Sequence, residues 1–159
     1  MPKTTATADL ADQVAEICAR HAMAEGPMLP ILHDIQADFG YIPEAAIPVV
    51  AKALNQTAAE VHGVMSFYHD FRSAPAGRRT VKICRAEACQ AMGANDLADT
   101  AKARLGVDWH GTTKGGEVTL EPVYCLGLCA CAPAAMVDGQ VIGRVDDARL
   151  EAVFAEAGL

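Results

Sequence analysis

The stretch VKICRAEAC, residues 81–89, joins the end of an alternating apolar run to a pair of cysteines. Val81 and Ile83 alternate with polar neighbours, which predicts a β-strand with one buried face. Cys84 and Cys89 follow, with four residues between them. The stretch therefore predicts a strand whose end presents two thiols.

A second cysteine pair repeats this arrangement further along the chain. Cys125 and Cys129, with three residues between them, follow a strand predicted over about residues 117–123. If the two strands are neighbours in one sheet, their ends bring four thiolates to one rim. Soft thiolates in a four-sulfur set select zinc, copper(I) or an iron-sulfur cluster. Spacing alone leaves zinc and iron-sulfur open, with disulfides a minority choice in a reducing compartment.

The residues around the cysteines mildly favour a cluster over a single zinc ion. Gly127 lets backbone pass close to bulky bridging sulfides, whose protein ligands are tuned by backbone donors. Small and apolar side chains in both loops would keep water off the site, although they could equally be plain packing. These side chains are Ala86, Ala88, Leu126, Leu128, Ala130 and Ala132.

Two cysteines remain outside the pairs. Cys18 lies on the apolar face of a predicted helix and is expected in the core, where free cysteine packs as a small hydrophobe. Cys131 follows Cys129 by two residues. We expect it to be a buried neighbour, with a substitute ligand or a resolving thiol as the alternatives. A Rieske site needs two histidine ligands, and neither cysteine pair encloses a histidine.

The rest of the second half predicts an α+β layer. A helix is expected over residues 92–105 with Met92 on its apolar side, and Asp138-Gly139 suits the tight turn of a hairpin. Asp146 can cap a last helix that ends at Gly158. Helices against a small mixed sheet follow, and this domain is placed at residues 79–159.

The first half predicts a helical domain over residues 1–72, with a surface connector at about 69–79. Helices are expected from Asp9 onward and over about 28–38. A third is expected to start near Pro43 and to carry 47–54, with Pro48 as a local irregularity. The clearest boundary is a capping box, in which Thr and Glu side chains satisfy free amides at a helix start, followed by an apolar face. Its residues are Thr57 and Glu60, followed by Val61, Val64 and Phe67.

Composition excludes several classes of protein. The chain has 159 residues, of which 52% are hydrophobic and 21% charged, as in soluble globular proteins. A formal charge of -7 repels nucleic acid and anionic membrane surfaces. Neither a leader nor a membrane span is apparent, because the longest uncharged stretch, residues 122–137, is too short to cross a bilayer. We therefore expect a cytoplasmic protein with reduced thiols.

Several groups of residues along the chain together form one pattern. They are Leu29-Pro30 with Ile35-Gln36, Phe39-Gly40-Tyr41-Ile42-Pro43, Gly63-Val64-Met65-Ser66-Phe67-Tyr68, and Cys125-Leu126-Gly127-x-Cys129 followed by Ala132-Pro133. The pattern resembles the thioredoxin-like [2Fe-2S] subunit of NADH-linked complexes. The resemblance implies an N-terminal helical bundle, a thioredoxin-like ferredoxin domain, and a [2Fe-2S] cluster. Its four ligands would be Cys84, Cys89, Cys125 and Cys129.

The same resemblance implies a role. Members of the family serve complex I, NAD-reducing hydrogenases and molybdenum- or tungsten-containing formate dehydrogenases, always beside a flavoprotein that binds FMN and NAD. The chain would be a non-catalytic electron relay. Residues 84–90 and 125–133 look most like the gamma subunit of formate dehydrogenase. Residues 113–116 read Thr-Lys-Gly-Gly, where the complex I subunit commonly has Thr-x-Asp-Gly. A zinc-bound scaffold and a dithiol enzyme are the alternatives from other classes.

Overall fold

The structure is a computed structural model, and it describes residues 7–159. Contacts divide the chain into two compact units, Met1–Pro75 and Ala76–Leu159. Within the described residues, no helix combines the length and the apolar character needed to cross a membrane.

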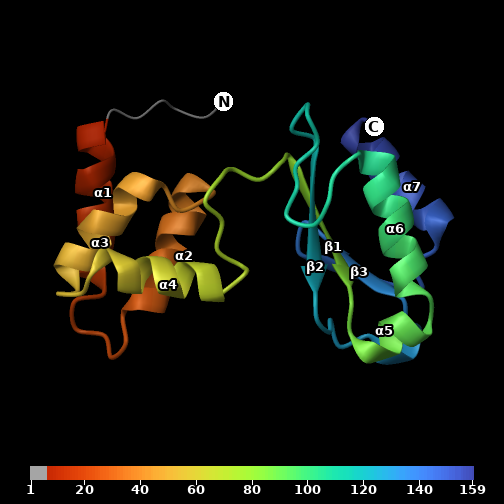
Figure 1. Cartoon of the computed structure of the whole chain (residues 1–159), viewed down its shortest axis with the longest axis horizontal. Coiled ribbons are helices and arrows are strands. Elements are labelled where there is room, and N and C mark those ends of the chain that lie inside the picture. The colour runs from red at the N-terminus through yellow and green to blue at the C-terminus, as the bar shows by residue number, and fades with distance from the viewer. Residues whose placement is uncertain (1–6) are drawn as a thin grey trace. The chain divides into compact units, whose positions relative to one another are not determined.

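The first unit is built from helices (Figure 1). Its core lies where α1 packs against α2 and α3, around side chains such as Val14, Ile31 and Val50, each 0% exposed. The elements are α1 (Thr7–Arg20), α2 (Met28–Phe39), the 3-10 turn η1 (Glu44–Ala46), α3 (Ile47–Ala53) and α4 (Ala58–Phe67).

The third predicted helix is interrupted. Pro43 precedes the 3-10 turn η1, and the α-helix proper begins only at Ile47. Pro48 therefore lies in the first turn of α3, where its missing amide hydrogen costs no intrahelical bond. The irregularity expected near Pro48 is present in another form, because the chain ends one short helix and starts another immediately before Pro48.

The capping box is confirmed in full. The Glu60 amide donates to the Thr57 hydroxyl, and the Thr57 amide donates to the Glu60 carboxylate at 2.7 Å. Val61 is buried on the inner face of α4. Phe67, predicted on that face, is 73% exposed at the end of the helix.

Gln36 ties α2 to the chain that follows α4. Its side-chain amide donates to the Asp70 carbonyl, and its carbonyl oxygen accepts from the Arg72 amide, each at 2.7 Å. The Arg72 carbonyl in turn accepts from the Ile42 amide at 2.7 Å. One glutamine therefore fixes a segment more than thirty residues away, which explains its place in the sequence pattern.

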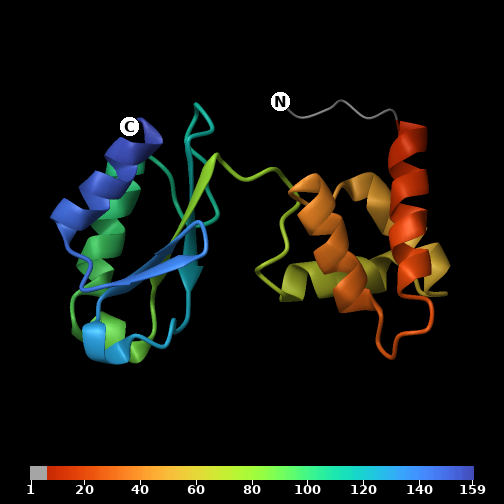
Figure 2. The same cartoon turned by 180° about the vertical axis from the view of Figure 1, so that it is seen from behind.

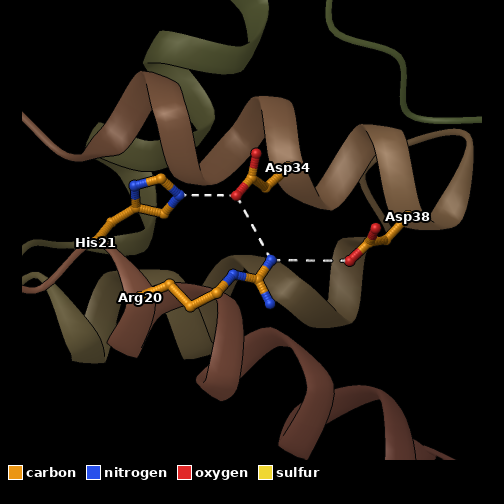
Figure 3. A network of polar contacts seen from close by, with 4 residues as sticks. All are labelled: Arg20, His21, Asp34 and Asp38. Atoms are coloured by element: carbon orange, nitrogen blue, oxygen red, sulfur yellow. Dashed lines mark hydrogen bonds and ion pairs between the residues drawn. The ribbon is translucent and has the colours of Figure 1, made fainter.

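A polar network joins the end of α1 to α2 (Figure 3). The His21 ring lies 2.8 Å from a carboxylate oxygen of Asp34, and the Arg20 guanidinium lies 3.5 Å from the same oxygen. Arg20 also reaches Asp38, one turn further along α2, at 4.0 Å. The hydrogen bond from His21, assisted by Arg20, holds the pKa of the Asp34 carboxyl below its usual value.

We expect Asp34→Asn to lower the melting temperature of the protein slightly at pH 7. A carboxyl whose pKa is lowered by folding contributes stability above its unfolded pKa, about 3.9, and loses it as the pH falls through the folded pKa. The difference from the native protein should therefore shrink below about pH 4 and at high salt. Thermal unfolding from pH 7 to pH 2.5 measures it, with the more distant Asp38→Asn as control. Equal melting temperatures at pH 7 would contradict the prediction.

The second unit is an α+β layer (Figures 1 and 2). Its sheet has the order β2-β1-β3-β4, with β1 parallel to β2 and the other neighbours antiparallel. The elements are β1 (Arg79–Cys84), α5 (Glu87–Ala91), α6 (Ala94–Leu105), β2 (Val118–Val123), η2 (Cys129–Cys131), β3 (Ala134–Val137), β4 (Gln140–Gly143) and α7 (Asp147–Ala157).

Helices α6 and α7 lie side by side on one face of this sheet (Figures 1 and 2). Between them and the strands is a core that includes Ile83, Leu120 and Phe154, each 0% exposed. The helix predicted over 92–105 is confirmed as α6, which begins two residues later, at Ala94, because Gly93 adopts a left-handed φ of 92° between α5 and α6. Met92, expected on an apolar side, is 61% exposed at this break.

The local signals in the last third of the chain are confirmed. Asp138 and Gly139 take positive φ values of 49° and 87°, as the tight turn between β3 and β4 requires. The Asp146 carboxylate accepts from the Arg149 amide at 2.8 Å at the start of α7. Together with the N-terminal helices, this mixed layer confirms the predicted α+β fold.

Candidate metal centre

The two cysteine pairs leave the sheet at the same edge. In the parallel register of β1 and β2, Cys84 lies opposite Val123, so both strands end together. The Arg85 amide extends the ladder by donating to the Val123 carbonyl at 2.7 Å. The two strands are therefore neighbours, as a shared rim requires, and the two ligand loops start side by side.

The four cysteines form an inner and an outer pair. Cys84 ends β1 and Cys89 lies in α5; they are 1% and 2% exposed, and the Cys89 thiol hydrogen-bonds to the Cys84 sulfur. Cys125 and Cys129 are exposed, and their sulfurs lie 3.8 Å apart. The site therefore has one pair in the protein interior and one at the surface.

Backbone amides and neighbouring thiols set the acidity of these cysteines. Burial by itself raises the pKa of Cys84, but hydrogen bonds from the Ala86 amide, the Cys89 thiol and, to a lesser extent, the Cys125 and Leu126 amides bring it below its usual value. Burial and the adjacent Cys84 raise the pKa of Cys89, and contact with Cys125 raises that of Cys129. The two thiols of the inner pair therefore differ in acidity, with the lower pKa at Cys84.

An apolar wall lies behind the inner pair. Cys84 and Cys89 pack in one buried cluster with Ala94, Ala132 and Ala134. Four of the residues expected to exclude water are found here: Ala132 belongs to the cluster, and Ala86, Leu126 and Leu128 pack against it. Ala130 is exposed. The expected apolar lining is therefore present on the inner side only.

The donor set fits a [2Fe-2S] cluster. Such a cluster takes four thiolates, two for each iron, and is tuned by hydrogen bonds to sulfur. Two thiol pairs and backbone donors aimed at one of them meet both requirements. Among residues 7–159, no three Cys, His, Asp or Glu side chains surround a point that could hold a single metal ion.

The remaining two cysteines, Cys18 and Cys131, lie outside the two pairs. Cys18 is 6% exposed in the core of the first unit, as expected, and burial raises the pKa of its thiol. Cys131 ends the short turn η2 and is half-buried against Gly143, the last residue of β4, rather than fully buried. The Arg144 amide donates to the Cys131 carbonyl at 2.6 Å. The outer ligand loop is thus fastened to the edge of the sheet.

We expect Gly143→Ala to destabilise the second unit by about 1–3 kcal/mol. A Cβ at this position would lie 2.8 Å from the Cβ of Cys131 and 2.9 Å from its carbonyl oxygen, so backbone has to move. Urea unfolding measures the loss. Gly116→Ala is a poor control because of its positive φ, whereas Gly63→Ala, with no atom near the added methyl, should not lower stability. Equal stability of Gly143→Ala and the native protein would refute the prediction.

Sequence reasoning missed the backbone of the outer loop. Cys125 has a φ of 82° and Gly127 a φ of 77°. The glycine signals such a conformation in the sequence, but the cysteine does not, because non-glycine residues rarely adopt it.

A mixed sheet with paired thiols at the shared end of two parallel strands defines a class, the small α+β proteins suited to carry a thiolate-held cluster. Comparison with known proteins gives the family. Residues 14–158 match the family described as thioredoxin-like [2Fe-2S] ferredoxin, and the chain belongs to it. The predicted family is confirmed.

The relatives are subunits of larger assemblies. The chain is 33% identical over 132 residues to HndA, a subunit of the NADP-reducing hydrogenase of Solidesulfovibrio fructosivorans, covering 83% of this chain and 77% of that protein. It is 37% identical over 123 residues to a subunit of the NADH-quinone oxidoreductase of Mycobacterium bovis. That match covers 77% of this chain but only 49% of the mycobacterial protein, so the chain spans about half its length.

A solved structure shares the fold. The crystal structure of an NAD+-reducing [NiFe]-hydrogenase in the H2-reduced state superposes with a TM-score of 0.70 at 23% identity. The match covers 83% of this chain and 22% of that one. At this identity the likeness establishes the architecture, and the thioredoxin-like ferredoxin fold is confirmed with it.

Proposed function

We propose that the chain holds one [2Fe-2S] cluster on Cys84, Cys89, Cys125 and Cys129 and relays single electrons to and from the FMN of an NADH-binding flavoprotein subunit. The cluster supplies one-electron oxidation and reduction. The chain holds it at the end of β1 and β2, keeps water from its inner side and donates hydrogen bonds to the Cys84 sulfur. It binds neither FMN nor NAD itself.

The pairing of the four thiols is the observation that carries this proposal. An inner pair in an apolar wall suits a buried iron, and an exposed outer pair suits exchange of electrons with another protein. Family membership supports a [2Fe-2S] cluster over zinc. The names of the relatives support a place beside a flavoprotein in an NADH-linked assembly.

Metal analysis of the purified chain tests the first half of the proposal. We expect a brown protein with two irons and two acid-labile sulfides per chain and an EPR signal after reduction by dithionite. Stoichiometric zinc without iron would replace the relay by a zinc-bound scaffold. Thiol exchange by an iron-free chain would support the dithiol alternative.

Reconstitution with the partner tests the second half. We expect NADH to reduce the cluster only when the co-purified flavoprotein subunit is present, as followed by the EPR signal. A flavoprotein that reduces artificial acceptors but leaves the cluster oxidised would overturn the proposed electron exchange.

We further propose that the assembly is a molybdenum- or tungsten-containing, NAD-dependent formate dehydrogenase. The support is the resemblance of residues 84–90 and 125–133 to the gamma subunit of those enzymes. The hydrogenase and NADH-quinone oxidoreductase relatives support those two assemblies to the same degree.

Affinity purification from the native source separates these assemblies. We expect molybdenum or tungsten in the co-purified complex, together with formate-dependent reduction of NAD. Nickel would instead identify a hydrogenase, and a quinone-linked membrane arm would identify a complex I. Either result would refute the formate dehydrogenase assignment while leaving the relay in place.

A further inference from the structure

The first unit carries an open groove of about 720 Å³ between the second half of α1 and α3. The two helices pack against each other (Figure 1). Ala15 and Ala19 of α1, and Ala22 just beyond its end, line one side of the groove. Val49 and Ala53 of α3 line the other. Nine of the ten lining residues are apolar, so the groove lacks the polar side chains that usually cover a helical surface.

The alanines along α1 are spaced as a contact with another helix requires. Ala15, Ala19 and Ala22 follow one another after four and three residues, so they lie in one row. All three are exposed. Small side chains in such a row let the axis of another helix come close, and the row spans about 10 Å, or two helical turns. The groove therefore suits a helix that binds through about two turns.

An exposed methionine extends the apolar surface at the end of this row. Met23 directly follows Ala22 and is 97% exposed, more than any other large hydrophobic side chain among the described residues. Methionine is unbranched and polarisable, and it adapts its shape to a bound partner. Met23 is thus available to pack on a helix that lies in the groove.

Lys52 supplies the charge of the groove. It is exposed, it is the only charged residue among those that line the groove, and it forms no ion pair with any residue in the described range 7–159. An apolar groove with one such cation selects an occupant that combines an apolar face with an acidic group.

Charge also decides among the candidate occupants. Residues 1–6, which precede α1, contain Lys3 and no acidic residue, so they cannot neutralise Lys52. A second copy docked groove to groove would bring its own Lys52 to the same place. An anionic membrane is repelled by the formal charge of -7. A different protein, with an acidic residue on its helix, fits the groove best.

We propose that the groove between α1 and α3 binds an amphipathic helix of a neighbouring subunit, with its apolar side chains against the alanine row and an Asp or Glu paired with Lys52. The proposal rests on the proposed place of the chain in a larger assembly. It does not rest on the cluster, because all four proposed ligands belong to the second unit. The helical unit thereby has a role in assembly that is separate from electron transfer.

Photo-crosslinking in the complex purified with its native partners locates the occupant. Met23→benzoylphenylalanine should crosslink to a helical segment of a partner subunit that contains an Asp or Glu, as identified by mass spectrometry of the joined peptides. Gln13→benzoylphenylalanine is the control, because Gln13 is exposed on α1 but does not line the groove, and it should not crosslink to that segment. Crosslinks from position 23 to residues 76–159, to a second copy or to lipid, or no crosslink at all, would overturn the proposal.

Ala19→Trp tests the shape of the groove. The indole fills the space above the alanine row, so we expect the dissociation constant for the crosslinked partner subunit to rise about tenfold or more. Gln13→Trp places the same side chain on α1 outside the groove and should keep the native constant. A folded Ala19→Trp chain with native affinity would refute the groove as a binding site.

Lys52→Glu tests the charge and keeps the proposal testable should Ala19→Trp fail to fold. We expect about threefold to tenfold weaker binding, restored when the acidic residue of the crosslinked segment is exchanged for Lys. Lys114→Glu, the same change at an exposed lysine of the second unit, controls for net charge and should bind as the native chain does. Native affinity in Lys52→Glu, or no recovery with the reciprocal exchange, would contradict the assigned occupant.

Failure of the proposed function gives a different result. A purified complex that holds zinc in place of iron but keeps the crosslink from position 23 would remove the relay and leave the helix contact. An iron-loaded complex without that crosslink would remove only the helix contact.

Discussion

Cys84→Ser is expected to leave the chain without a cluster. Cys84 is 1% exposed and contacts Cys89, so it is the most enclosed of the four proposed ligands. A serine hydroxyl is a harder and less acidic ligand and cannot replace a soft thiolate there. Iron and labile sulfide should fall to background, and the EPR signal of the reduced protein should disappear.

Cys131→Ser provides the matched control. Cys131 lies two residues beyond Cys129 and packs against Gly143 at the edge of the sheet. A serine of nearly equal volume should leave iron content and the EPR signal unchanged. Loss of iron in Cys131→Ser together with native iron in Cys84→Ser would move the ligand set to the spare thiol. Cys125→Ser should weaken or abolish the signal, since its exposed sulfur belongs to the outer pair.

Phe154→Ala should lower the free energy of unfolding of the second unit by about 3–5 kcal/mol. Phe154 is 0% exposed and is among the largest fully buried side chains of the chain. It lies in α7 within the core that includes Leu120 and Ala101. Truncation removes its buried apolar surface and leaves a cavity between helix and sheet, which neighbouring small residues cannot fill.

Urea unfolding monitored by circular dichroism measures the loss, with Met92→Ala as the control. Met92 is 61% exposed, so its truncation should change stability by no more than about 0.5 kcal/mol. Iron content should be compared at low denaturant, because a cluster that binds only the folded chain would add to the apparent stability. A loss below about 1 kcal/mol in Phe154→Ala would show that the core relaxes around the gap.

The sequence correctly predicted those elements whose ends are fixed by interactions between residues that are near one another in the chain. The capping box at Thr57, the Asp138-Gly139 turn and the cap at Asp146 each depend on hydrogen bonds or backbone angles within a few residues. Such signals can be recognised in the sequence because they do not depend on contacts with residues far away in the chain. The alternation of Val81 and Ile83 predicted β1 for the same reason.

Tertiary packing decided the elements that sequence reasoning placed wrongly. The third helix breaks before Ile47, and Phe67 is exposed at the end of α4. The short α5 and the exposure of Met92 follow from Gly93, whose left-handed turn lets the chain pass from the ligand loop into α6. The helical spacing of apolar residues through these segments could not show where one helix ends and the next begins.

The sequence predicted two cysteine pairs at the ends of neighbouring strands, and the structure places them there, whereas their role as the cluster ligands stays a prediction. Cysteine type and strand-end position were enough to bring four thiols to one rim. The division into an inner and an outer pair, and the left-handed backbone at Cys125, emerge only from the structure. The assembly to which the chain belongs is determined by the surfaces of its partner chains. The assignment to a formate dehydrogenase, rather than to a hydrogenase or complex I, therefore stays a proposal.

The parallel pairing of β1 with β2 also bears on when the site can form. Cys84 and its register partner Val123 are separated by the whole α5–α6 crossover, so their pairing is a non-local contact of the kind that forms slowly. Until it forms, the two thiol pairs belong to separate stretches of chain. Iron that arrives earlier would meet only two cysteines at a time. Cluster loading should therefore follow folding of the crossover, which makes metal content a late marker of correct folding.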